Sequence, residues 1–194
     1  MKKWILLILV IILASTSFTG CKESTDEEVY YKFQKKINKL DSYSCIANIS
    51  VCGNKSIKDY EAIHYFKSPN YYKLQTLNPS NIKGKITIYD DDKIIIKNPK
   101  YNDELKLTNR GIENRYLFVG DFLKNIFENE DLKISYDKYF LILETNIPGS
   151  SFYFNKQKIY VDKKTLKPNK LEIMDVNLKK RFVVNYKEFK YNGD

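Results

Sequence analysis

The chain is poor in the residue types on which most enzyme and metal sites depend. Its 194 residues include one histidine, three cysteines, seven glycines and five prolines. Any histidine general base or zinc trio would have to use His64, and the few glycines form no phosphate-cradling loop. Cys45 and Cys52 lie seven positions apart in one expected strand. They would be roughly 23 Å apart, whereas a disulfide needs Cα atoms within about 7 Å. We therefore expect no enzyme activity, no cofactor and no internal disulfide.

The amino-terminal segment has the features of a secretory leader. Two lysines follow Met1, and residues 4–14 are all apolar, which is shorter than the ~20 residues of a permanent membrane helix. The segment 18–21, Phe-Thr-Gly-Cys, resembles a lipobox with phenylalanine where leucine is usual. The resemblance implies cleavage between Gly20 and Cys21 and diacylation of the Cys21 thiol. A secreted or membrane-anchored chain with an unmodified Cys21 is the alternative.

These features predict the domain organisation and the location of the chain. Residues 1–20 are the predicted signal peptide, residues 21–25 a lipidated tether and residues 26–194 a single domain. The net charge is +9 for the whole chain and +7 without the leader, which holds two lysines and no acid. An exported basic protein meets anionic lipid headgroups rather than nucleic acid. We expect a lipid anchor on the extracytoplasmic face of the cell membrane and no nucleic-acid partner.

Two helices are predicted from hydrophobic spacing. Thr25, with Glu28 three residues later, has the form of a capping box, and the acidic residues 26–28 suit a helix amino end. Apolar residues then recur at spacings of three and four, which predicts a helix over about 26–41 with one apolar face. A second apolar cluster predicts a central helix or helix pair across 113–129.

The rest of the chain shows strand patterns. From Tyr43 the hydrophobic period is two, with Cys45, Ala47 and Ile49 on the same side as Tyr43. Similar segments, separated by turn residues, give eight to eleven antiparallel strands. The predicted strands span 43–52, 57–67, 71–77, 85–89, 93–97, 132–137, 139–146, 152–162, 169–176 and 181–190, with a loop or short strand after Pro99. The fold class is therefore α+β, a curved antiparallel sheet with helices on one face.

His64 has two interpretations. It can be a neutral histidine packed on an apolar strand face, or it can join Cys45 and Cys52 in a metal site. The packed interpretation is favoured because the two cysteines face opposite sides of their strand by parity. The acidic run 90–92 lacks the spaced ligands of a calcium loop and fits a solvated hairpin tip. We expect no metal.

Aromatic residues are abundant, with 16 tyrosines and 11 phenylalanines. Many fall on strand faces that should be buried, where aromatic side chains are favoured. The ordinary interpretation is sheet packing. The functional interpretation is a concavity, lined by amphipathic rings, that holds an acyl chain or a loop of a partner.

Several stretches resemble the LolA/LolB superfamily of lipoprotein carriers and receptors. They are the helix end at 40–43, the Phe-Lys-Ser-Pro-Asn-Tyr-Tyr-Lys-Leu stretch at 66–74, and the closing strands at 159–168 and 183–189. The resemblance implies an incomplete, half-closed antiparallel β-barrel of about eight to eleven strands, covered by an N-terminal and a middle helix. Lys73 stands where the carriers usually have arginine, which weakens the case for lipid carriage.

Within that superfamily the chain looks most like the GerS-type spore-germination lipoproteins of clostridia. That resemblance implies a non-catalytic partner that binds and activates an exported N-acetylmuramoyl-L-alanine amidase in spore cortex modification. It also implies a location on the forespore membrane, facing the intermembrane space. The alternative function is a LolA/LolB-like carrier of lipid or lipoprotein acyl chains. Open barrel edges also allow a homodimer by strand exchange.

Overall fold

The computed structural model describes residues 24–108, 114–128, 130–149 and 151–191. The predicted signal peptide 1–20, its cleavage site at Gly20 and the lipidation site Cys21 lie outside the described residues. The helices are α2 (Asp26–Ile37), η2 (Ser80–Ile82), η3 (Asn114–Leu117) and α3 (Val119–Glu128). The strands are β1 (Ser42–Cys52), β2 (Ile57–Lys67), β3 (Tyr71–Asn78), β4 (Ile86–Asp90), β5 (Lys93–Asn98), β6 (Asp103–Thr108), β7 (Lys133–Tyr136), β8 (Phe140–Asn146), β9 (Lys156–Asp162), β10 (Pro168–Met174) and β11 (Lys180–Tyr191).

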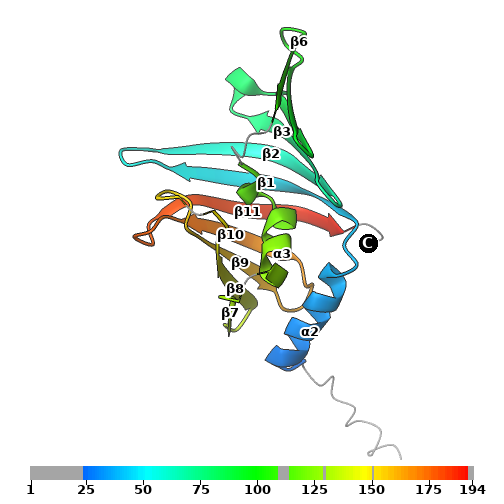
Figure 1. Cartoon of the computed structure of the whole chain (residues 1–194), viewed down its shortest axis with the longest axis vertical. Helices are drawn as coiled ribbons and strands as arrows, with labels where there is room; N and C mark the ends of the chain where they lie inside the picture. Colours follow the sequence, from blue (N-terminus) through cyan, green and yellow to red (C-terminus); the bar gives the residue numbers. More distant parts are fainter. Residues whose placement is uncertain (1–23, 109–113, 129, 150, 192–194) are drawn as a thin grey trace, which may run out of the picture.

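All eleven strands form one antiparallel sheet in the order β6-β5-β4-β3-β2-β1-β11-β10-β9-β8-β7. Every pairing joins sequence neighbours except β1 with β11, which connects the two halves of the chain. Strands β6 and β7 are the two edges, so the sheet is not closed. Figure 1 shows this open, curved sheet with α3 lying across it and α2 at one end. The expected fold, an incomplete antiparallel barrel with two helices, is confirmed.

The core lies between the sheet and the two helices. In β1 the residues Tyr43, Cys45, Ala47 and Ile49 are buried, as the period of two predicts. Helix α2 buries Val29, Phe33 and Ile37, which follow the spacing of one helix face. Helix α3 contributes Phe122, Leu123 and Ile126 to the same cluster. Because both helices present one apolar stripe to the sheet, they cover its inner face.

Helix α3 approaches the sheet closely at Gly120. A Cβ atom built there would lie 2.6 Å from the Phe66 ring, far inside van der Waals contact. The Tyr43 hydroxyl accepts a hydrogen bond of 3.3 Å from the Gly120 N–H. This tyrosine is stacked between Phe66 and Phe189, with ring centroids 5.4 and 4.8 Å away. A glycine therefore lets the start of α3 rest directly on the aromatic core.

Two boundaries differ from the sequence-based expectations by more than two residues. Helix α2 begins as predicted, with the Glu28 N–H donating to Thr25 Oγ1 over 3.3 Å, but it ends at Ile37 rather than near residue 41. The central segment forms the helix pair that was one of its two predicted forms, as η3 and α3. The strand expected to begin at residue 152 begins at Lys156, because Ser151 and Phe154 close a turn with a 3.0 Å backbone hydrogen bond. Among the described residues, no helix is both long and apolar enough to cross a membrane.

Candidate interaction surfaces

The inner face of the sheet is filled by side chains. Tyr72, Phe118 and Phe122 are fully buried there, and the Tyr186 hydroxyl donates to the Leu117 carbonyl over 2.9 Å. Between α2, α3 and β8 lies a cavity of only about 10 Å³. Ligand pockets commonly measure about 300–1,000 Å³, so this space has no room for an acyl chain. Of the two interpretations of the aromatic residues, ordinary packing fits the described part of the inner face.

His64 belongs to this packed interior. Its side chain is 0% exposed, and its ring lies 4.4 Å from that of Phe118. Neither ring nitrogen has a hydrogen-bond partner among the described residues. Burial lowers the pKa of His64 from 6.5 to about 3, because a charged imidazolium would lose its water. The expected neutral, packed histidine is confirmed.

The two cysteines are free thiols at different depths. Cys45 faces His64 across the β1–β2 pair and is buried, while Cys52 pairs with Ile57 at the far end of the hairpin. Burial raises the pKa of the Cys45 thiol far above its usual range, which leaves it unreactive. Within the described ranges, no cluster of three histidine, cysteine or acidic side chains could hold a metal ion. The acidic residues 90–92 lie at the β4–β5 turn.

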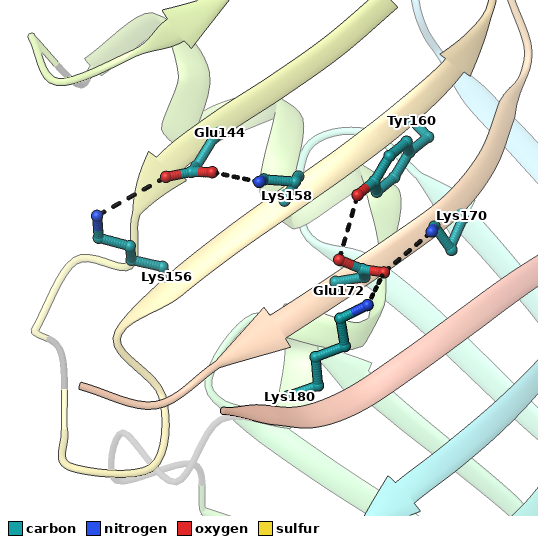
Figure 2. A network of polar contacts seen from close by, with 7 residues as sticks. All are labelled: Glu144, Lys156, Lys158, Tyr160, Lys170, Glu172 and Lys180. Carbon is teal, nitrogen blue, oxygen red and sulfur yellow. Dashed lines mark hydrogen bonds and ion pairs between the residues drawn. The ribbon is translucent and has the colours of Figure 1, made fainter. Parts of the chain in front are cut away.

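A network of charged side chains crosses the outer face of β8–β11 (Figure 2). At its centre the carboxylate of Glu172, 3% exposed, accepts from Lys180 at 2.8 Å and pairs with Lys170 at 3.0 Å. The Tyr160 hydroxyl donates to the second oxygen of Glu172 over 3.3 Å. Burial alone would raise the pKa of Glu172, but the hydrogen bonds from Lys180 and Lys170 outweigh it and hold the pKa below its usual value.

Glu144 repeats the arrangement two strands away. Its carboxylate lies 2.7 Å from the Lys158 ammonium and 3.7 Å from that of Lys156. The hydrogen bond from Lys158 lowers the pKa of Glu144 despite partial burial. Because each carboxylate is shared by two lysines, this face has more positive than negative charge. These residues bridge strands β8 to β11 and stabilise the sheet.

A third surface lies at the end of the sheet where three connections meet. They are the β1–β2 turn (53–56), the β8–β9 loop (147–155) and the β10–β11 turn (175–179). All three lie at the left in Figure 1. We call this the tip face and define it by its exposed apolar side chains. These are Ile57, Phe152, Tyr153, Val176 and Leu178, each between 45% and 65% exposed.

A buried ion pair holds the tip face together. The Arg181 guanidinium donates to Asp175 Oδ2 from Nε at 2.8 Å and lies 2.6 Å from it at the Nη2 atom. The other Asp175 oxygen accepts from the backbone N–H groups of Asn177 and Lys179 at 2.9 and 3.0 Å. Burial would raise the pKa of Asp175, but these hydrogen bonds together lower it. The carboxylate is therefore charged at neutral pH and shapes its own turn.

The same arginine contacts all three segments of the tip face. Its Nη1 atom donates to Asn54 Oδ1 in the β1–β2 turn over 2.8 Å. Its guanidinium lies 5.1 Å from the ring centroid of Tyr153 in the β8–β9 loop. The Val176 N–H donates to the Phe152 carbonyl over 3.2 Å. Between these segments is an open groove of about 330 Å³, lined by residues 51–54 and by Tyr153, Phe154, Arg181 and Phe182.

Neither this surface nor the Glu172 network was predicted from the sequence. The run 175–178 reads as an ordinary turn, and Arg181 as one member of a basic triplet. The available signal was Asp175 two residues before Asn177 and four before Lys179, a spacing that suits a carboxylate accepting local backbone bonds. Nothing in the spacing shows that Arg181 would reach Asn54, because the two lie in separate hairpins.

Comparison with known proteins identifies the family. A family model described as "Sporulation protein YdcC-like" matches residues 1–194. The chain belongs to this YdcC-like sporulation protein family. It is 20% identical over 198 residues to the sporulation protein YdcC of Bacillus subtilis, covering 98% of this chain. The chain spans 57% of the length of that relative.

Solved structures give a closer match. A chain in the structure of the CwlD amidase from Clostridioides difficile in complex with the GerS lipoprotein is 46% identical to this chain, with a TM-score of 0.57. The match covers 90% of this chain and 100% of that one. The resemblance to GerS-type lipoproteins is thereby confirmed. An uncharacterised conserved protein from Thermus thermophilus shares the fold, with 13% identity, a TM-score of 0.53 and coverage of 87% and 88%.

Proposed function

We propose that this chain is a membrane-anchored, non-catalytic protein that binds and activates an exported N-acetylmuramoyl-L-alanine amidase in spore cortex modification, a step needed for germination. The observation that supports it most strongly is the 46% identity to a chain from the CwlD–GerS complex. Membership of a sporulation family is consistent with this role. The tight packing of His64 and Cys45 also suits a protein that acts by binding rather than by chemistry.

The proposal includes the predicted anchor. Diacylation at Cys21 would hold the chain on the membrane far more firmly than one acyl chain could, and in a sporulating cell this is the forespore membrane, facing the intermembrane space. Carriage of a lipid or lipoprotein acyl chain, the alternative from sequence, is less favoured because the cavity between α2, α3 and β8 measures only about 10 Å³. A homodimer formed by strand exchange at an open edge such as β6 stays a prediction, tested by light scattering.

Two measurements on the full chain test the function. Affinity-tagged protein, solubilised with detergent from sporulating cells, should co-purify the CwlD-type amidase of the same organism. Amidase turnover on peptidoglycan should rise when the chain is added and should be absent when the chain is present alone. An amidase that is neither captured nor stimulated would contradict the proposal. Hydrolysis by the chain alone would contradict its non-catalytic part, and bound lipid in native mass spectra would support the carrier instead.

A further inference from the structure

We propose that the tip face is the surface through which this chain binds its amidase partner, and that the bound surface of the partner is acidic around an apolar anchor side chain. This inference rests on the proposed function and adds the location and the chemistry of the contact. Three properties of the tip face support it: its exposed apolar side chains, its rigid support and its charge.

The apolar side chains are concentrated and are of the types that bind proteins strongly. Phe152, Tyr153 and Leu178 are each more than half exposed, and they come from two connections that contact each other. Exposed apolar clusters commonly mark interaction sites, and aromatic side chains carry much of the energy at protein interfaces. The adjoining groove of about 330 Å³ has room for a large apolar side chain of the partner.

The support under these side chains is ordered before any partner arrives. Asp175 holds the β10–β11 turn through two backbone N–H groups, and Arg181 connects that turn to Asn54 and Tyr153. A loop that is already held in its bound shape loses less conformational entropy on association. The buried pair therefore positions the apolar groups, and its Arg181 also lines the adjoining groove.

The solvent-facing charge of the tip face is positive. The β8–β9 loop 147–155 contains no charged residue, and the turns 53–56 and 175–179 contribute the exposed side chains of Lys55 and Lys179. The one acidic residue of these three connections, Asp175, is buried against Arg181. Like charges across an interface are costly and opposite charges speed association. An acidic rim on the partner is the complementary match.

The position of the predicted tether favours a protein over the membrane. The Lys163 ammonium pairs with Asp26 at the start of α2, which places that helix end beside the end of β9 at Asp162. The tip face lies at the opposite end of β9, beside Lys156, which is about 20 Å from Asp162 along the strand. The five residues from Cys21 to Thr25 reach at most ~18 Å. Figure 1 shows α2 and the three tip connections at different ends of the sheet.

A pair of matched double variants tests the inference in the full-length, detergent-solubilised chain. Tyr153→Ser with Leu178→Ser removes two apolar groups of the tip face. Tyr139→Ser with Leu105→Ser removes the same side-chain types where they are 59% and 50% exposed elsewhere. Kd for the purified CwlD-type amidase of the same organism should weaken about 30-fold or more in the first variant. It should stay within about 3-fold in the second, and thermal melts of both variants check that each is still folded.

A charge variant gives an independent measurement. Lys55→Glu with Lys179→Glu should lower the association rate constant for the amidase about 10-fold at low salt. It should also make this rate constant depend less on salt concentration. Wild-type binding that survives both the apolar and the charge variants would overturn the tip assignment while leaving the proposed function intact. No wild-type binding would remove the proposed function and the inference together. The last alternative is a membrane surface, tested with vesicles rich in phosphatidylglycerol and Cys21→Ala protein. If tip variants in this protein abolish vesicle binding but leave amidase binding unaffected, the tip face is assigned to the membrane instead.

Discussion

His64 makes the folded state sensitive to acid. The folded protein keeps the imidazole neutral down to about pH 3, whereas the unfolded chain protonates it below its ordinary pKa of 6.5. Because the pKa is lower in the folded state, the stabilising contribution is complete above about pH 6.5 and is lost as the pH falls towards 3. Each pH unit in that window removes about 1.4 kcal/mol from the free energy of unfolding.

Replacing the imidazole by an apolar side chain of similar size isolates this effect. His64→Leu fills the same space against Phe118 and leaves no unpaired ring nitrogen in the core. At neutral pH we expect the variant to be as stable as the wild type or more stable, since no hydrogen bond is lost. At about pH 5 its advantage should have grown by about 2 kcal/mol, which is one proton over one and a half pH units.

Urea denaturation followed by far-UV circular dichroism, repeated across the pH range, measures this difference. Gln157→Leu is a matched control, because Gln157 is equally buried, has no hydrogen-bond partner among the described residues and does not titrate. Its stability curve should run parallel to that of the wild type as the pH falls. Parallel curves for His64→Leu and wild type would refute the reasoning, as would a large loss of stability at neutral pH, which would reveal a bond to the imidazole.

Three further outcomes are expected. Gly120→Val should destabilise the fold by about 1–3 kcal/mol because the valine side chain would enter the Phe66 ring. Adding Phe66→Leu should partly restore the melting temperature. An unchanged melting temperature in Gly120→Val would count against the close contact. Glu172→Gln should lower the free energy of unfolding, measured with urea at neutral pH, by about 1–3 kcal/mol. This loss should shrink as the pH falls below 4.5, because the pKa of Glu172 is lowered in the folded state. A difference between variant and wild type that stays constant with pH would contradict this. Cys21→Ala should abolish labelling by a fatty-acid analogue, and continued labelling would disprove Cys21 as the acylated residue.

Local patterns were sufficient to predict most of the elements. The capping pair Thr25 and Glu28 predicted the start of α2, and the alternation from Tyr43 predicted β1 and its buried side. Such predictions succeed because the hydrophobic period follows directly from backbone geometry. The prediction for the carboxyl end of α2 was less accurate, because Leu40 continues the helical spacing although the helix has already ended at Ile37.

The candidate site could not be predicted in the same way. Glu172 reads as a polar residue in an alternating strand, yet its carboxylate is buried between lysines of β10 and β11. Arg181 reads as part of a basic run, yet it joins the turns of two hairpins by bonding to both Asp175 and Asn54. Both roles depend on which strands become neighbours and in which register, and that information is not contained in any one segment.

The order of residues alone specifies the leader pattern, the first turn of α2 and the alternation of each strand, because these depend on neighbours within a few positions. The pairing of β1 with β11, the filling of the inner face by Phe118 and Phe122, and the gathering of three connections into the tip face arise only when distant segments pack. Hydrophobic burial and cross-strand hydrogen bonding select that arrangement collectively. For this reason the surface proposed to meet the partner is visible only in the folded chain.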